Sequence, residues 1–334
     1  MNEKVPFRMP RVIAWEVTRR CPLKCRHCRA GAADVPYSNE LSTAECLRVL
    51  DSLTPPSSHP SPPSQPSHPS SMIIWTGGEP MLRSDILQLV AHATELGIRS
   101  VMAPCGMLVT EERLRELKAA GVMACSFSLD GPDAASHDAF RGVPGAYDNV
   151  THAMEIAKSI GMPFQVNTTV STLNIDRLEE IHAKAIALGA AKLDLFFLVP
   201  VGRGSAIANY ALSDEQTRQV LDWAFAKAEQ GLLAIKETCC PSAPAYWAQR
   251  TSPSRFKVPG SGFKAQPPSA ISSRPCGCLG GRGFAFLSHV GDLQTCGFID
   301  KPCGNIRDFD CDFRALVAAA ENPLGLSGTC RSQL

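Results

Sequence analysis

Apolar, β-branched stretches alternate with longer amphipathic stretches through the first 230 residues, and this alternation limits the possible folds more than any other feature. Alternating strands and helices form a parallel sheet with right-handed crossovers. Six such units predict an α/β fold, an open partial (β/α)6 barrel rather than a closed barrel of eight. The strands are expected at 11–18, 72–76, 99–104, 123–130, 163–170 and 192–199. The helices are expected at 42–53, 84–96, 110–120, 147–160, 174–189 and 213–230.

Local signals mark the ends of several of these helices. Ser42 in STAE and Ser213 in SDEQ are expected to cap helix N-termini. Glycines are expected at helix C-termini, namely Gly97, Gly121, Gly161 and Gly189.

Two stretches interrupt the alternation. TPPSSHPSPPSQPSHPSS (54–71) is too rich in Pro and Ser to form a helix or a core, so we expect an exposed insertion of polyproline II character. Residues 251–275 have the composition of a linker. We therefore expect a barrel at 1–235, a linker at 236–275 and a cysteine-rich β-hairpin extension at 276–334.

Composition places the chain among globular proteins of a reducing compartment. Of 334 residues, 44% are hydrophobic and 19% charged, and the formal net charge of +1 predicts no attraction to nucleic acid or to an acidic membrane. MNEKVPFRMPRV lacks the apolar region of a signal peptide, so a cytoplasmic location is expected. The 14 cysteines are then expected to be metal ligands, catalytic groups or buried apolar residues rather than disulfides.

The loop after the first expected strand contains CPLKCRHC, with cysteines at 21, 25 and 28. A structural zinc site would need four protein ligands, and a [4Fe–4S] cluster usually has four cysteines. Three thiolates would leave one iron of such a cluster open to a small chelating molecule. The spacing alone is equally compatible with three unrelated cysteines that bind no cluster.

Two further motifs follow expected strands. TGGEP (76–80) offers two glycines for close backbone approach and Glu79 as an acceptor for an ammonium group. SLDGP (128–132), with HDAFR (137–141) beyond it, offers Ser128 for hydrogen bonding and Arg141 for gripping a carboxylate. Each motif alone could be an ordinary turn, but three in this order are much harder to produce by chance.

Together, C-x3-C-x2-C, GGEP and SLDGP…R resemble the radical S-adenosylmethionine (SAM) superfamily, over roughly residues 11–210. The resemblance implies a [4Fe–4S] cluster whose open iron chelates SAM, and reductive cleavage of SAM to a 5′-deoxyadenosyl radical. The cluster ligands that it implies are Cys21, Cys25 and Cys28. The SAM-binding and cavity residues that it implies are Gly77, Gly78, Glu79, Ser128, Arg141, Asn167 and Val199. His27 is expected to shield the cluster.

The C-terminal region resembles the opening of the SPASM extension, which carries auxiliary [4Fe–4S] clusters. FAFLSHVGDLQTCGF (284–298) is expected to be a β-hairpin that turns at 289–292. One auxiliary cluster at most is expected, because a second cysteine-dense run would begin at Cys330, four residues before the last. The expected ligands are Cys276, Cys278 and Cys296, with Cys239, Cys240 and Cys303 as further candidates. Buried free thiols are expected at Cys46, Cys105 and Cys125.

EVTRRCPLKCRHCRAGA and GCLGGRGFAFLSHVGDLQTCGFIDKPCGNIR most resemble the haem-biosynthesis branch of the superfamily. This implies an iron tetrapyrrole substrate, removal of acetate groups from 12,18-didecarboxysirohaem, and an electron donor such as flavodoxin or ferredoxin. Alternatives are an iron-coproporphyrin III decarboxylase, a haem d1 synthase-like enzyme, a peptide or sulfatase maturase, and a degenerate homologue without turnover. The substrate carboxylates are expected to meet Arg29, Arg203 and Arg282.

Overall fold

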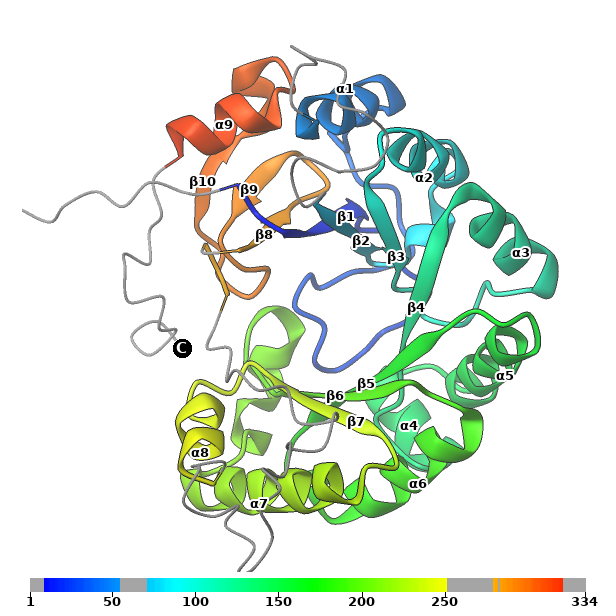
Figure 1. The fold of residues 1–334 in the computed structure, drawn as a ribbon, viewed down its shortest axis with the longest axis vertical. Coiled ribbons are helices and arrows are strands. Elements are labelled where there is room, and N and C mark those ends of the chain that lie inside the picture. The colour runs from blue at the N-terminus through cyan, green and yellow to red at the C-terminus, as the bar shows by residue number, and fades with distance from the viewer. Residues whose placement is uncertain (1–8, 55–70, 251–278, 282, 321–334) are drawn as a thin grey trace, which may run out of the picture.

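The computed structural model describes residues 9–54, 71–250, 279–281 and 283–320 of the chain (Figure 1). The described strands form one sheet of ten, in the order β10-β9-β8-β1-β2-β3-β4-β5-β6-β7. Its parallel part consists of β1 (Val12–Thr18), β2 (Met72–Gly77), β3 (Arg99–Met102), β4 (Val122–Ser128), β5 (Phe164–Val170), β6 (Lys192–Phe197) and β7 (Ala234–Thr238). The C-terminal strands are β8 (Phe284–Leu287), β9 (Asp292–Gln294) and β10 (Pro302–Asn305).

The helices lie outside the curved sheet, while the loop that follows β1 crosses its open interior (Figure 1). The α-helices are α1 (Thr43–Leu53), α2 (Ile86–Glu95), α3 (Glu111–Ala120), α4 (Ala134–Arg141), α5 (Ala146–Ser159), α6 (Leu178–Leu188), α7 (Asp214–Gln230), α8 (Ala243–Arg250) and α9 (Phe313–Ala319). Short 3-10 helices are η1 (Pro80–Leu82), η2 (Ile175–Arg177), η3 (Gly202–Tyr210) and η5 (Ile306–Phe309). Among the helices of the described residues, none is long and apolar enough to cross a bilayer.

The expected α/β partial barrel is confirmed, and alternation along its strands explains the shape. Outward side chains such as Trp15 and Trp75 are at most 1% exposed, and their rings stack 5.6 Å apart beneath the helix layer. Successive strand residues point to opposite faces. The inward face of β4–β6 is more polar, with Ser126, Asn167 and Asp194. Burial of the outward apolar side chains therefore holds the helices on the outer face of the sheet, and the polar side chains point into the barrel interior.

The expected helix ends are also found. Ser42 and Ser213 each form a capping box, with Glu45 and Gln216 respectively. Gly121 and Gly189 are left-handed C-caps at φ 115° and 88°. Gly97 and Gly161 stand one residue beyond their C-caps, also with positive φ.

Several elements were not expected from the sequence, among them β7, α8, α4, β10 and α9. Strand β7 and helix α8 occupy residues 234–250, most of which were assigned to the linker, so that part of the linker expectation is wrong. β7 was missed because AIKET contains two adjacent charged residues and is identified only by its pairing with β6. Helix α4 was missed because it is 8 residues long, although its N-cap Asp133 accepts a hydrogen bond from the Ser136 N–H.

The C-terminal hairpin continues the barrel sheet. β8 pairs in parallel with β1 and antiparallel with β9, and the turn lies between Leu287 and Asp292 as expected. The second hairpin strand then pairs with β10, and α9 packs near α1 (Figure 1). The hairpin is thus joined to the barrel through its first strand.

The expected insertion at 54–71 lies almost wholly outside the described residues. We predict that deleting 55–70 and joining Thr54 to Ser71 with a short Gly/Ser linker changes the free energy of unfolding by only about 0.5 kcal/mol, since loop closure depends weakly on length. Urea unfolding followed by circular dichroism measures the change. A loss of several kcal/mol would show that the segment packs against the barrel.

Candidate active site

The loop from Arg19 to Ala33 carries the three predicted ligands at the carboxyl end of β1. Cys21 and Cys25 are buried, at 7% and 8% exposure, and Cys28 is half-buried. They belong to one small apolar cluster with Leu23 and Ala32. Burial raises the pKa of the Cys25 thiol, and the charges of Cys28 and Cys21 raise it further. The structure therefore brings the three thiols of CPLKCRHC together.

Two neighbouring elements hold this loop in place. At the end of α4, the carbonyls of Arg141 and Phe140 accept hydrogen bonds from the N–H groups of Lys24 and Arg26, at 3.1 and 3.0 Å. From η3, the Arg203 guanidinium donates to the Cys25 carbonyl at 2.9 Å and to the Ala32 carbonyl at 2.5 Å. Arg203 is thus engaged with the backbone of the cysteine loop.

Gly77 and Gly78 allow β2 to approach the start of the same loop. A Cβ on Gly77 would lie 2.2 Å from the Thr18 carbonyl oxygen, and one on Gly78 would lie 2.4 Å from the carbonyl oxygen of Arg20. Contacts this short require glycine. From the sequence we expected these glycines to leave room for a ligand. The structure shows that they allow the end of β2 to lie against the backbone at the start of the cysteine loop. Binding of SAM by these glycines stays a prediction.

Glu79 is fully buried and already has two donors. Its carboxylate accepts the Met81 N–H at 2.8 Å and the Cys105 N–H at 2.5 Å. Burial raises the pKa of this carboxyl group. A carboxylate has about four acceptor positions, so Glu79 keeps capacity for an ammonium group.

Arg141 contacts two buried groups of the chain, and its contact with SAM stays a prediction. Its guanidinium lies 2.5 Å from the Asp130 carboxylate and 3.6 Å from the Cys25 sulfur. Both partners are buried, and the charge of Arg141 lowers the pKa of Asp130 against the effect of burial. The contacts that the structure shows for Arg141 are thus with Cys25 and Asp130. Burial raises the pKa of the Cys25 thiol, and the charge of Arg141 opposes that rise.

Of the remaining predicted SAM contacts, Ser128 and Val199 lie at the carboxyl ends of β4 and β6, whereas Asn167 lies in the middle of β5. Ser128 is in register with Asn167. The Asn167 amide donates to the Ser126 hydroxyl at 2.8 Å, and Val199 is buried. Contact of these residues with SAM stays a prediction.

His27, predicted to shield the cluster, stacks on Phe140 with ring centroids 4.6 Å apart. Burial lowers its pKa to about 4. A neutral ring packed in this way is consistent with a shielding role.

Cys105 was expected to be a general buried thiol, as Cys46 and Cys125 are in the main core. Instead, Cys105 packs against the small apolar cluster that contains Cys21. A side-chain hydrogen bond between Cys105 and Cys21 lowers the pKa of Cys21. The N–H of Cys105 binds Glu79. The position of Cys105 in APCGM, directly after the third expected strand, could have indicated that it lies near the site.

The cysteine loop fits a cluster better than a single ion. Within the described ranges, no three Cys, His, Asp or Glu side chains converge closely enough to hold one metal ion. A [4Fe–4S] cluster is larger and binds soft thiolates at separate irons. Three thiols on one loop, two of them buried and one beside Arg141, provide that donor set.

The structure describes only some of the predicted auxiliary ligands. Cys276 and Cys278 lie outside the described residues, as does Cys330. Cys296 is half-buried just after β9, and Cys303 is half-buried on the neighbouring β10. Their role as ligands stays a prediction.

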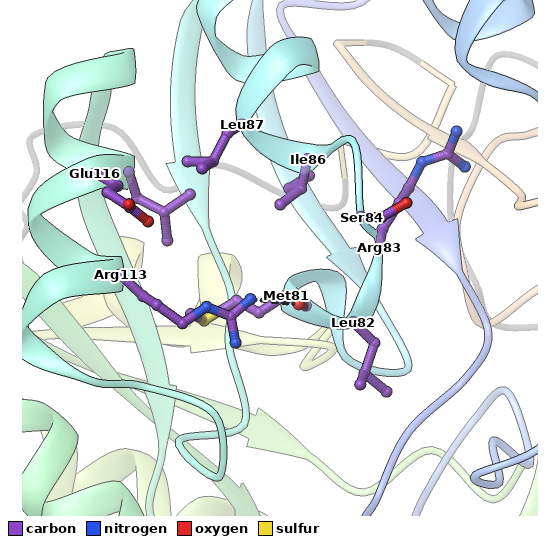
Figure 2. A pocket seen from close by; sticks show the side chains of 9 residues that line it. Met81, Leu82, Arg83, Ser84, Ile86, Leu87, Arg113 and Glu116 are labelled. Atoms are coloured by element: carbon purple, nitrogen blue, oxygen red, sulfur yellow. Dashed lines mark hydrogen bonds between the residues drawn. The ribbon is translucent and has the colours of Figure 1, made fainter.

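A cavity of ≈ 280 Å³ lies outside the barrel, between α2 and α3 and behind the GGEP turn (Figure 2). Its lining includes Met81, Leu87 and Glu116, and the Arg113 side chain donates to the Met81 carbonyl across it at 2.7 Å. No residue predicted to bind SAM or the cluster lines this cavity.

Comparison with known proteins supports the class that the barrel and cysteine loop define. The Radical SAM superfamily model matches residues 15–185. AdoMet-dependent heme synthase of Nitratidesulfovibrio vulgaris is 39% identical over 298 residues, which are 89% of this chain and 76% of that protein. The protein of the same name from Methanosarcina barkeri is 34% identical over 327 residues, covering 96% of this chain and 87% of that protein.

A solved structure shares the fold. Streptococcus suis SuiB bound to precursor peptide SuiA aligns with a TM-score of 0.69 at 17% identity, over 96% of this chain and 66% of that chain. The likeness at this identity concerns the fold alone.

The chain belongs to the radical SAM superfamily, whose enzymes use a [4Fe–4S] cluster to cleave SAM reductively. Within that superfamily, its similarity along most of its length is to the proteins named AdoMet-dependent heme synthase.

Proposed function

We propose that this enzyme acts on an iron tetrapyrrole and removes acetate side chains from 12,18-didecarboxysirohaem. The observation that carries the proposal is the similarity to AdoMet-dependent heme synthases, which extends through the C-terminal hairpin as well as the barrel. The same barrel edge also holds the three cysteines and Glu79.

In this proposal the chain's own residues divide the work. Cys21, Cys25 and Cys28 hold the cluster, which supplies the electron for SAM cleavage when bound. Glu79 receives the SAM ammonium group and Ser128 its ribose or carboxylate. Arg203 and the end of α4 keep the cysteine loop fixed. A flavodoxin or ferredoxin is the proposed electron donor.

The substrate carboxylates need cations, and the structure changes which ones we propose. Arg203 binds backbone carbonyls, and Arg29 lies 2.6 Å from buried Glu16, so neither is free as the sequence suggested. Arg282 lies outside the described residues. The next source of positive charge is the inward face of β6 and β7.

Lys192 and Lys236 are the cations on that face. Asn167, Asp194 and Lys236 are directly paired across β5, β6 and β7, so they point to the same side of the sheet. Both lysine Nζ atoms approach Asp194, at 3.7 and 3.3 Å. Two lysines around one carboxylate leave a net positive charge for an acidic substrate.

We predict that Lys192→Ala with Lys236→Ala raises KM for the tetrapyrrole at least about tenfold, because a hydrogen bond to a charged group contributes about 1.5–3 kcal/mol. SAM cleavage without substrate should be unchanged. Lys184→Ala is the matched control, since its Nζ lies over the Tyr147 ring. An unchanged KM in the double variant would place the substrate elsewhere.

The function itself is tested by anaerobic reconstitution with iron and sulfide and assay with SAM, a reductant and 12,18-didecarboxysirohaem. The proposal expects loss of acetate groups with formation of 5′-deoxyadenosine. Turnover of iron-coproporphyrin III or of a haem d1 precursor instead would overturn the substrate assignment. So would modification of a peptide, or SAM cleavage without turnover of any tetrapyrrole.

We further propose one auxiliary cluster held by Cys278 and Cys296, with Cys276 as a further ligand. An enzyme with both clusters fully occupied would contain about eight irons, at four irons per cluster, and partial loss of the auxiliary cluster would give ~4–8. Cys296→Ala should lower the iron content towards four while leaving SAM cleavage in place. Iron and sulfide analysis of purified protein measures this, and about twelve irons in the wild-type chain would contradict it.

A further inference from the structure

A buried carboxylate connects the C-terminal hairpin to the cysteine loop. Glu16, on the inward face of β1, is 0% exposed and lies among the side chains of Arg29, Arg19 and His289. Its oxygens are 2.6 Å from Arg29, 3.0 Å from Arg19 and 2.8 Å from Nδ1 of His289. Burial alone would raise the pKa of Glu16, but His289 and the two arginines lower it to about 2.

The partners of Glu16 come from separate parts of the chain. Arg29 directly follows Cys28, so its position affects the last cluster ligand. His289 lies in the turn between β8 and β9, more than 250 residues away. The Arg29 guanidinium also lies over the Phe286 ring of β8, at 4.1 Å from the centroid. The hairpin therefore contacts Arg29 directly through the Phe286 ring and indirectly through His289 and Glu16.

His289 also supports the far end of the loop. Its ring packs edge-on against Tyr37, with centroids 5.9 Å apart. The Tyr37 hydroxyl accepts the Ala33 N–H at 3.0 Å, and the Ala33 carbonyl accepts the Cys21 N–H at 3.0 Å. One side chain of the hairpin turn is thus linked to the loop near its first and its last cysteine.

We propose that His289 is a positioning residue for the SAM-binding cluster, acting through Glu16–Arg29 and through Tyr37. The proposal depends on the radical SAM cluster and is independent of which substrate the enzyme uses. Removing the His289 ring leaves Glu16 without one of its three partners and Tyr37 without its neighbour. The loop then opens more easily at both ends, and the cluster becomes accessible to chelators.

The test compares His289→Ala with His289→Asn in the reconstituted full-length protein. Asn keeps an N–H donor near the position of Nδ1, so it should restore much of the wild-type behaviour. The measurements are the rate of iron loss to a chelator under anaerobic conditions and the EPR spectrum of the reduced cluster with SAM. We expect about tenfold faster iron loss and an altered spectrum in His289→Ala, with partial recovery in His289→Asn.

Two further variants keep the test decisive. Phe286→Leu removes the ring beneath Arg29 and should also speed iron loss, even if His289→Ala folds poorly. His152→Ala, at a histidine whose side chain is 69% exposed, is the matched control and should behave as wild type. Unchanged iron loss and an unchanged spectrum in both His289→Ala and Phe286→Leu would overturn the proposal. Failure on a tetrapyrrole substrate would leave it intact.

Discussion

Alanine at Cys21, Cys25 and Cys28 together is expected to abolish SAM cleavage, with 5′-deoxyadenosine falling to the background of the assay. The three thiols share one small cluster, and the Cys25 sulfur lies 3.6 Å from the Arg141 guanidinium. Without these sulfurs the chain keeps no donor set at the carboxyl end of β1 for a reducible cluster. Liquid chromatography of the anaerobic reaction with dithionite and SAM measures the loss.

The matched control is Cys46→Ala, which removes a thiol on the buried face of α1 in the main core. It should retain the absorption of the cluster and the cleavage of SAM. Continued formation of 5′-deoxyadenosine by the triple variant would place the cluster on other cysteines. Equal loss in the control would show that the effect comes from the fold.

Arg141→Ala is expected to destabilise the protein by about 3–5 kcal/mol, the usual consequence of leaving one member of a buried ion pair alone. The Asp130 side chain is 0% exposed and lies 2.5 Å from Arg141, and the same guanidinium contacts Cys25. The free energy of unfolding in urea measures the loss. A comparison of metal-free proteins separates it from cluster binding.

The destabilisation caused by Arg141→Ala is expected to depend on pH. Arg141 holds the pKa of Asp130 below its ordinary value, so the pair stabilises the folded protein above about pH 4, where the unfolded carboxyl is ionised. That stabilisation is lost as the pH falls through the lower folded pKa. The gap between wild type and Arg141→Ala should therefore narrow below about pH 4. Asp130→Asn with Arg141→Met should recover part of the loss, and a gap that widens in acid would contradict the ion-pair explanation.

The barrel could be predicted because its signals are local. Apolar alternation marked six strands, and Ser42 and Ser213 marked helix starts through side chains three residues apart. Strand β7 could not be predicted, since two of its five residues are charged and only pairing with β6 defines it. Position at a strand end was enough to bring Cys21, Glu79 and Ser128 to one edge of the sheet.

The contacts of the long charged side chains could not be predicted from sequence. Arg29, Arg141 and Arg203 were each expected to meet a ligand, and the structure shows for each a contact within the protein that the sequence did not indicate. Their partners are distant in the sequence, and a guanidinium reaches several of them with little change in the backbone. Cys105 was missed for a related reason, because its neighbour Cys21 comes from a different strand loop.

The parallel pairing of β8 with β1 has a consequence for synthesis on the ribosome. Until residues 284–287 have emerged, β1 is an open edge, and Glu16 lacks His289. At ~5–20 residues per second, this interval lasts roughly ten seconds to a minute. The nascent barrel therefore exposes strand hydrogen-bonding groups beside its unprotected cysteines during that time, and the loop reaches its final form only after β8 and His289 have been made.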